Sequence, residues 1–272
     1  MTLLDAVAFT GTQTEASAFE ILSVFWGPDR DELEQAIEVK ALLDDQGLAV
    51  SCYTLQNDWA VFDKEANRTC IDLAISRLET AKILGTQAIR LDPQTDLAGR
   101  ERSDVDADKI LDLLAPGMAE VAIAAESGGI RVGVENHGGL VGSTAHVEKL
   151  IRLVDRPNFG VNIDFTNFRT GYGEDHVKST RRLAKHVIHA HIKDFHISKT
   201  PKEGWRQAPG GDYIRRCVGG EGDGQWPELV GILADAGYEG AIALEISSED
   251  TATFTTGVAN LKRIIDEAQA TG

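Results

Sequence analysis

The sequence predicts a (β/α)8 TIM barrel, in which eight parallel strands form a ring inside a layer of helices. Apolar strand-like runs alternate along the chain with stretches of helical period, as at Val147, Leu150, Ile151 and Val154, and this alternation is typical of parallel βα units. The 272 residues fit eight units of roughly 30 residues each. A doubly wound nucleotide-binding sheet is disfavoured, because no GxGxxG motif follows the first strand-like run.

Seven strand-like runs are clear. They span residues 19–26, 48–55, 87–91, 130–135, 159–164, 187–193 and 241–246. An eighth strand has to come from residues 3–9, which leaves little chain for a helix before the next run. Either the first βα unit is abbreviated, or this segment is a helix and the barrel is irregular there. No linker rich in Pro, Gly or Ser divides the chain, so residues 1–272 are expected to form one barrel domain.

The charge and cysteine content narrow the classes of partner. Lys and Arg number 27 and Asp and Glu number 43, a net charge of −16 that repels nucleic acids and anionic membrane surfaces. No apolar run reaches the length of about 18 residues that spans a bilayer. The first residues carry no Lys or Arg and include Asp5, which argues against a secretory signal. Three cysteines without a CxxC motif indicate a reducing compartment, so we expect a cytoplasmic protein with a small-molecule partner.

Four of the strand-like runs end in a residue that can bind a metal ion: Glu135, Asp164, His191 and Glu245. The first three are each about one βα unit apart, and the fourth follows one further unit with a long loop. In a parallel barrel the carboxyl ends of all strands lie at one mouth, where barrel enzymes place their catalytic groups.

Strand periodicity predicts that these four side chains point into the barrel. The residues that alternate with them in these strands, such as Val132 and Val134, are apolar and would face the helices. The residues two positions earlier, which share their side of the strand, are small or polar: Gly133, Asn162, His189 and Ala243. The alternative is that four unrelated polar residues happen to cap four strands.

Three carboxylates and an imidazole at one mouth would repel one another without a cation among them. A set of three oxygens and one nitrogen suits one hard divalent ion, Mn²⁺ or Mg²⁺, although Co²⁺ or Zn²⁺ could substitute.

Several short motifs reinforce this pattern. They are Glu135-Asn136-His137-Gly138-Gly139, Asp164-Phe165-Thr166-Asn167, His189-Ala190-His191-Ile192-Lys193-Asp194, Gly220-Glu221-Gly222-Asp223-Gly224 before Trp226-Pro227, and Ala236-Gly237-Tyr238-Glu239-Gly240 before Leu244-Glu245. From about residue 48 to the C-terminus the chain resembles the sugar phosphate isomerase/epimerase superfamily, of the xylose-isomerase-like barrel type. As a set the motifs are specific for this superfamily, and they are weak for any one substrate.

The resemblance implies a divalent metal ion held by Glu135, Asp164, His191 and Glu245. It also implies that Glu135 and Glu245 flank the substrate as acid and base. The second His of the pair is then the ligand, and His189 lies on the barrel floor. We expect Lys193 to act on a substrate oxygen, with an ion-paired rim lysine as the alternative.

The remaining site assignments are less specific. His137 is expected to touch substrate or to hydrogen-bond a ligand, and Trp59 to form a stacking wall or to pack within its loop. Glu221 belongs either to a loop that closes over the site or to a solvated turn. Asn167 stands where ketose 3-epimerases of the superfamily resemble Asp-x-x-His, and Ile197 where they carry Arg, which argues against a free-ketohexose epimerase.

We therefore predict a metal-dependent isomerase or epimerase of a keto-sugar or related polyol, acting through an enediolate by proton transfer to and from glutamate. The alternative is a lyase of a keto-cyclitol or keto-sugar, as in the inosose and dehydroshikimate dehydratases of the superfamily. A non-catalytic sugar-binding barrel is a further alternative. An abasic-site endonuclease is disfavoured by the 7 His and the acidic charge. By analogy with the superfamily, the chain could form a homo-oligomer.

Overall fold

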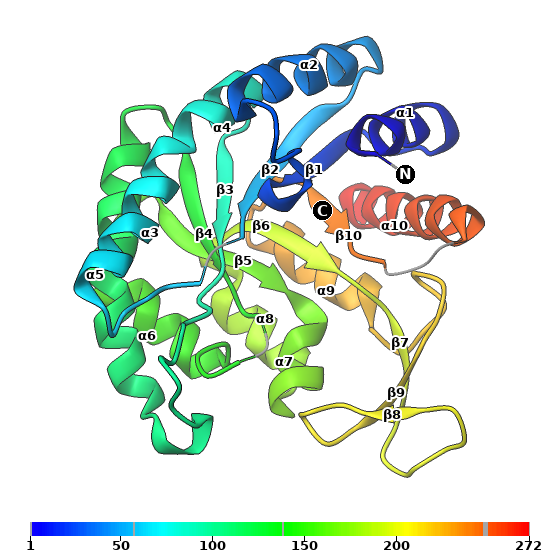
Figure 1. Ribbon diagram of the computed structural model, residues 1–272. Helices are drawn as coiled ribbons and strands as arrows, with labels where there is room; N and C mark the ends of the chain where they lie inside the picture. Colours follow the sequence, from blue (N-terminus) through cyan, green and yellow to red (C-terminus); the bar gives the residue numbers. More distant parts are fainter. Residues whose placement is uncertain (1, 57, 138, 247–249, 272) are drawn as a thin grey trace.

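The computed structural model describes residues 2–56, 58–137, 139–246 and 250–271 (Figure 1). Gly138 of the first motif therefore lies outside the described residues. Seven parallel strands form one sheet in the order β1-β2-β3-β4-β5-β6-β10. They are β1 (Ala18–Leu22), β2 (Ala49–Leu55), β3 (Ala88–Leu91), β4 (Arg131–Glu135), β5 (Phe159–Asp164), β6 (Val187–Ile192) and β10 (Ile242–Leu244). Each of the seven predicted runs overlaps one of these strands, and six contain theirs entirely.

The sheet curls into a nearly closed barrel, which confirms the predicted fold class. Within the described part of the chain, β10 pairs with β6 and has no pairing with β1, so the ring has seven strands and one open seam. The segment from which an eighth strand was expected is helix α1 (Leu3–Gln13). The barrel is therefore irregular at its N-terminus, as the second of the two alternatives proposed.

Local chemistry explains why α1 is a helix. Thr2 and Asp5 form a capping box, in which the Thr2 hydroxyl accepts a hydrogen bond from the Asp5 N–H and the Asp5 carboxylate accepts one from the Thr2 N–H. Val7 is fully buried against the core, with Leu3 and Leu4 packed beside it. The capping box and the apolar face together favour a helix over a strand.

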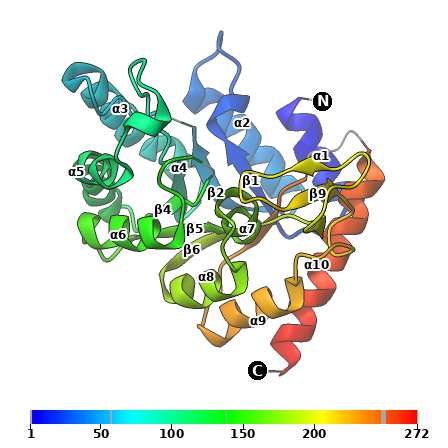
Figure 2. The same cartoon turned by 90° about the horizontal axis from the view of Figure 1, so that it is seen from below.

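The other helices cover the outside of the sheet (Figure 2). They are α2 (Glu32–Asp45), α3 (Lys64–Ser76), α4 (Leu78–Leu84), α5 (Ala107–Glu126), α6 (Thr144–Val154), α7 (Phe165–Tyr172), α8 (His176–Leu183), α9 (Trp226–Asp235) and α10 (Thr251–Thr271), with 3-10 turns η1 (Ser23–Phe25), η2 (Arg102–Asp104) and η3 (Ala184–His186). Among the described residues, no helix combines the length and the apolar character that crossing a membrane requires.

The hydrophobic core lies between the strands and these helices. The apolar neighbours of the predicted ligands, including Val134, Ile163 and Ile192, are buried in this layer. The side chains that alternate with these neighbours, including those of the predicted ligands, consequently point to the barrel axis, as strand periodicity predicts.

A small antiparallel sheet follows β6, in the order β7-β9-β8. Its strands are β7 (Phe195–Ser198), β8 (Arg206–Gln207) and β9 (Tyr213–Arg216). The sequence indicated only a long loop here. Figure 1 shows this sheet projecting beside the barrel mouth.

Asp194 ties the small sheet and the following loop to the end of β6. Its carboxylate accepts hydrogen bonds from the backbone N–H groups of Phe195, Gly220, Gly222 and Gly224, at 2.8 to 3.0 Å. A Cβ on Gly222 would lie 2.3 Å from Asp194 Oδ1, so the loop approaches the carboxylate too closely for any larger residue. One buried carboxylate thereby fixes a loop of about five residues.

We predict that Asp194→Ala lowers the free energy of unfolding by about 2 kcal/mol or more, because four backbone donors lose a charged acceptor. Urea denaturation would measure this change. Glu221→Ala is the matched control, since Glu221 is an exposed side chain of the same loop and should change stability by about 0.5 kcal/mol at most. Equal effects of the two substitutions would contradict the role of Asp194.

Candidate metal centre

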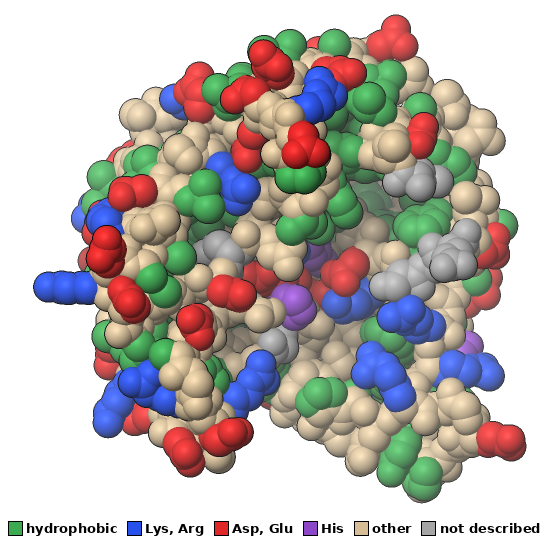
Figure 3. All heavy atoms as spheres, in the orientation of Figure 1, with side chains coloured by type: hydrophobic (Ala, Val, Ile, Leu, Met, Phe, Trp, Pro, Cys, Tyr) green, Lys and Arg blue, Asp and Glu red, His purple; other side chains and the backbone are tan. Residues whose placement is uncertain are grey.

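The structure brings the four predicted ligands together at the barrel mouth. Glu135, Asp164 and His191 end or nearly end β4, β5 and β6, and Glu245 follows β10. One ligand atom from each residue lies within 4.8 Å of the others. Figure 3 shows acidic side chains and histidine at the bottom of a hollow in the centre of this face.

The four side chains differ in their exposure. Glu135, Asp164 and His191 are buried, whereas the side chain of Glu245 is 48% exposed. His191 Nδ1 lies 3.4 Å from Glu135 Oε1 and 3.6 Å from Glu245 Oε2. The cluster therefore has a buried floor of three groups and one carboxylate at the open side.

Buried ligand atoms indicate that this cluster suits a cation. Glu135 Oε2 and Asp164 Oδ2 are buried and are ion paired with Arg90 and Lys193, at 2.9 and 2.8 Å, whereas His191 Nδ1 is buried without a hydrogen bond of proper geometry among the described residues. Buried polar atoms normally have a partner, so this nitrogen beside three carboxylates needs an explanation. Three carboxylates and one imidazole nitrogen are ligands that Mn²⁺ and Mg²⁺ accept. The residues present thus fit the divalent ion that the resemblance implies.

Backbone hydrogen bonds orient Asp164. Its Oδ1 caps helix α7 by accepting from the N–H groups of Thr166 and Asn167, at 2.9 and 3.0 Å. Asn136 makes two hydrogen bonds to the Asp164 backbone, at 2.7 and 2.8 Å, and so joins the ends of β4 and β5. Only Asp164 Oδ2 is left to face the cluster.

Glu20 on β1 orients His191, and the sequence analysis did not select it. Its Oε2 lies 2.7 Å from His191 Nε2, and its Oε1 accepts a hydrogen bond from the Thr54 hydroxyl. Burial opposes ionisation of this carboxyl, but the nearby His191 and His189 lower the pKa of Glu20 to about 2. The carboxylate therefore favours the tautomer that has its proton on Nε2 and the Nδ1 lone pair directed at the cluster.

The sequence did contain a signal for Glu20. It lies between apolar Phe19 and Ile21, so it has the inward orientation of the other site residues. The predicted strand ran on to Trp26, whereas β1 ends at Leu22. In a strand that ended at Trp26, Glu20 would lie far from the mouth.

Lys193 lies among the ligands rather than at an outer rim. Its Nζ is 2.8 Å from Asp164 Oδ2 and 3.3 Å from both oxygens of Glu245. Burial opposes the ammonium charge, but the carboxylates of Asp164 and Glu245 raise the pKa of Lys193. The ammonium group is therefore charged at neutral pH and is ion paired inside the site.

A second charged group lies on the other side of Glu135. Arg90 Nη2 is 3.0 Å from Asp92 Oδ2 and also 2.9 Å from Glu135 Oε2. His137 Nδ1 is 3.2 Å from Asp92 Oδ1, and the His137 side chain is 45% exposed. Its contact with Asp92 raises the pKa of His137. His137 thus borders the site with a hydrogen-bonded and accessible ring.

The other predicted contacts are placed differently. Asn167 is buried beside Asp164, and among the described residues its Nδ2 has no hydrogen-bond partner. His189 lies on the barrel floor as expected, with its Nδ1 2.6 Å from Asn162 Oδ1. Glu221 is an exposed residue of the loop that Asp194 fixes, and among the described residues it has no ion pair to the cluster.

Trp59 does not form a stacking wall. It is fully buried in the hydrophobic core, and its indole N–H donates to the Asp92 carbonyl at 2.7 Å. It therefore has no surface to offer a substrate. The expectation failed because the end of a strand places a residue near the mouth but does not decide whether it faces the cavity or the helices.

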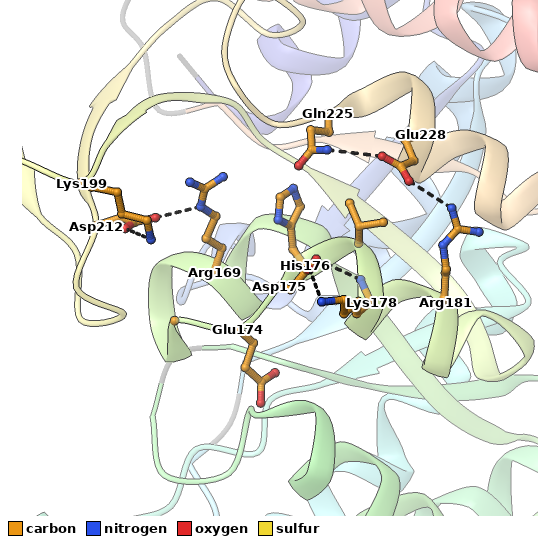
Figure 4. Close-up of a pocket in the computed structure, with 12 residues that line it drawn as sticks. Arg169, Glu174, Asp175, His176, Lys178, Arg181, Lys199, Asp212, Gln225 and Glu228 are labelled. Carbon is orange, nitrogen blue, oxygen red and sulfur yellow. Dashed lines mark hydrogen bonds and ion pairs between the residues drawn. The ribbon is translucent and has the colours of Figure 1, made fainter.

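Cavities lie near the mouth, and two of them are large enough for a small molecule. One, of about 390 Å³, is bordered by Lys193 and Glu245 and extends towards the small sheet. A larger one, of about 620 Å³, lies between α8, α9 and the small sheet (Figure 4). Residues that line it form ion pairs with one another, such as Arg169–Asp212 and Arg181–Glu228. Because the first cavity borders Glu245 of the cluster and Lys193 beside it, it is the space in which a substrate could reach the cluster.

The family comparison agrees with this geometry. A family model described as the xylose isomerase-like TIM barrel matches residues 11–271. The chain belongs to this family. A search of curated protein sequences finds no match.

Solved structures show the same fold at low sequence identity. A xylose isomerase-like TIM barrel protein from Mycobacterium smegmatis in complex with magnesium is 18% identical, with a TM-score of 0.73, and the match covers 98% of this chain and 87% of that one. The 3-keto-D-glucoside 4-epimerase from E. coli is 16% identical, with a TM-score of 0.67 and coverage of 99% and 94%. The probable 3-DHS dehydratase from Bacillus anthracis is 17% identical, with a TM-score of 0.70 and coverage of 96% and 93%. Proteins of this fold thus include an epimerase and a dehydratase.

We predict that Glu20→Gln weakens binding of Mn²⁺ about 10–100-fold, because it removes the carboxylate that holds the His191 tautomer. Calorimetric titration of metal-free protein with Mn²⁺ would measure this. Glu15→Gln is the matched control, since Glu15 is exposed just before β1 and should leave the affinity unchanged. An unaltered affinity in Glu20→Gln would show that Glu20 does not orient a ligand.

Proposed function

We propose that the protein is a divalent-metal-dependent isomerase or epimerase of a keto-sugar or related polyol. Glu135, Asp164, His191 and Glu245 would hold one ion, Mn²⁺ or Mg²⁺. The observation that carries this proposal is the convergence of four ligand side chains, three of them buried, at the ends of adjacent strands. The epimerase among the solved structures of this fold gives further support.

When bound, the ion supplies a Lewis acid that acidifies the C–H bond beside a substrate carbonyl. Glu135 and Glu245 are the two candidate proton carriers. Strands β5 and β6 separate β4 from β10 in the sheet, so the two carboxylates enter the site from different sides. Burial opposes ionisation of Glu135, but Arg90 and His191 lower its pKa, which keeps it an available base at neutral pH.

This arrangement accounts for both reactions. Removal of a proton by one glutamate and return from the other side inverts the carbon, which is epimerisation. Return to the adjacent carbon exchanges aldose and ketose, which is isomerisation. Lys193, within 3.3 Å of the Glu245 oxygens, would bind a substrate oxygen and stabilise its negative charge. Asn167 Nδ2 and the exposed ring of His137 would hold further hydroxyls.

A lyase is the second candidate. Its specific support is His137, whose pKa is raised by its hydrogen bond with Asp92, so that this ring at the border of the site retains its proton to a higher pH than a free imidazole. A proton from this ring would allow a β-hydroxyl to leave as water after proton removal by glutamate. The dehydratase among the solved structures has the same fold.

The proposal extends to partners and location. A small carbohydrate fits the cavity of about 390 Å³, whereas the acidic net charge and the carboxylates of the mouth disfavour a nucleic acid. We propose a cytoplasmic location because the free cysteines suit a reducing compartment. A homo-oligomer is proposed by analogy alone.

The test is exchange of solvent deuterium into keto-sugars and keto-cyclitols by protein loaded with Mn²⁺. Glu245→Gln should lower the exchange rate by about 100-fold or more, since it removes a proton carrier. Glu239→Gln is the matched control, because Glu239 is exposed just before β10 and outside the site. Equal exchange by Glu245→Gln and the unaltered protein would contradict the proposal.

The same incubation separates the two reactions. A lyase would release water and leave an unsaturated ketone, which absorbs in the ultraviolet. Deuterium exchange without this absorbance is expected for the isomerase or epimerase. If the absorbance grows in step with substrate loss, the protein is a lyase, and the isomerase or epimerase proposal is rejected.

A further inference from the structure

We propose that the substrate carries an anionic group, a carboxylate or a phosphate, and that Arg206 and Arg216 of the small sheet bind it. The proposal rests on the proposed function, because it names the class of substrate that reaches the same site. The juxtaposition that carries it is a cavity bordered both by Glu245 of the metal cluster and by the two arginines.

The cavity of about 390 Å³ joins these two regions. Lys193 and Glu245 border it on the side of the cluster, and Arg206 and Arg216 border it on the side of the small sheet. A substrate that presents its carbonyl to the cluster would therefore extend its far end towards the two guanidinium groups.

Strand register places both arginines on one face of the small sheet. Arg206 is the direct partner of Ile214 on the neighbouring strand, and Arg216 lies two residues beyond Ile214. Direct cross-strand partners and residues two apart share a face, and such diagonal neighbours lie about 7–8 Å apart. Phe195, the partner of Arg216 on β7, has the Arg206 guanidinium 6.0 Å from its ring centre. This face borders the cavity.

Arg215 points to the opposite face. Its guanidinium lies 5.4 Å from the ring centre of Trp205, which His196 and Lys202 also contact. Neither Arg215 nor Trp205 borders the cavity. The alternation of β9 thus separates an arginine inside the cavity from one outside it.

Among the described residues, the carboxylates that border the cavity are already engaged. Asp194 accepts four backbone hydrogen bonds, and Glu245 is paired with Lys193 and belongs to the metal cluster. Arg206 has no ion pair with any carboxylate in the described part of the chain. A guanidinium group binds carboxylate and phosphate strongly.

The local charge contrasts with the rest of the molecule. Residues 193–216 carry six Lys and Arg against three Asp and Glu, in a chain whose net charge is −16. Figure 3 shows blue side chains gathered beside the central hollow, over the region of the small sheet. A positive border on an acidic protein attracts an anionic ligand to the mouth and leaves neutral sugars without this advantage.

The test compares three ligands that share one keto-hexose skeleton: D-fructose, D-fructuronate and D-fructose 6-phosphate. Their dissociation constants would be measured by calorimetry at low ionic strength with protein loaded with Mn²⁺. We expect at least one charged ligand to bind tenfold or more tightly than D-fructose. The charged ligand that binds more tightly shows whether the anionic group of the substrate is a carboxylate or a phosphate.

Arg206→Gln and Arg216→Gln should each reduce this preference to threefold or less, while Arg215→Gln, the matched control, should retain it. Arg206 lies on an exposed two-residue strand, so Arg206→Gln should fold normally. This variant therefore tests the proposal even if Arg216→Gln does not fold. The proposal is overturned if neither charged ligand binds more tightly than D-fructose, or if the preference survives in Arg206→Gln.

A metal-free measurement separates this proposal from the proposed function. Inorganic phosphate should bind chelator-treated protein and lose at least threefold in affinity in Arg206→Gln, whatever the fate of the metal cluster. Normal deuterium exchange with no arginine-dependent phosphate binding would overturn the anion site alone. Arginine-dependent phosphate binding without any deuterium exchange would retain the anion site and reject the proposed reaction.

Discussion

The repulsion among carboxylates at the barrel mouth is the constraint on which the rest of the site depends. Glu135 and Asp164 are buried, and Glu245 closes the cluster from the open side. Burying like charges is costly unless cations compensate them. Arg90 and Lys193 supply two such charges, one on either side of the cluster. A divalent ion would bind to the ligand atoms that remain, including His191 Nδ1.

Much of the fold could be predicted because parallel strands alternate with helices and carry a period of two. The same period predicted the inward orientation of Asp164 and His191. It could not identify α1, whose capping box is a local signal that competes with the apolar pattern of residues 3–9. The small sheet was missed because its strands, such as the two-residue β8, are too short for a periodic signal.

Errors in the site follow from the same limits. Periodicity gives the side of a strand on which a residue lies, but the strand's true end decides its depth in the barrel. Glu20 was overlooked for this reason, and Trp59 was assigned to the mouth although its indole is bound to the Asp92 carbonyl within the core. The pairing of Lys193 with Asp164 and Glu245 depends on how three strand ends meet, which sequence spacing does not specify.

The structure divides the proposed work between two regions. The barrel supplies a rigid floor, where Asn136 and Glu20 fix the orientation of Asp164 and His191 through hydrogen bonds. The small sheet adds a positively charged border that Asp194 anchors to the end of β6. Chemistry would then reside in the barrel, and substrate selection in the inserted sheet.

The most direct test of the central claim is a crystal structure of protein grown with Mn²⁺, with anomalous scattering measured at the manganese edge. The account predicts one strong anomalous peak bound by Glu135, Asp164, Glu245 and the Nδ1 atom of His191. A peak bound by Asp92 and His137 instead, or no peak at the barrel mouth, would contradict it.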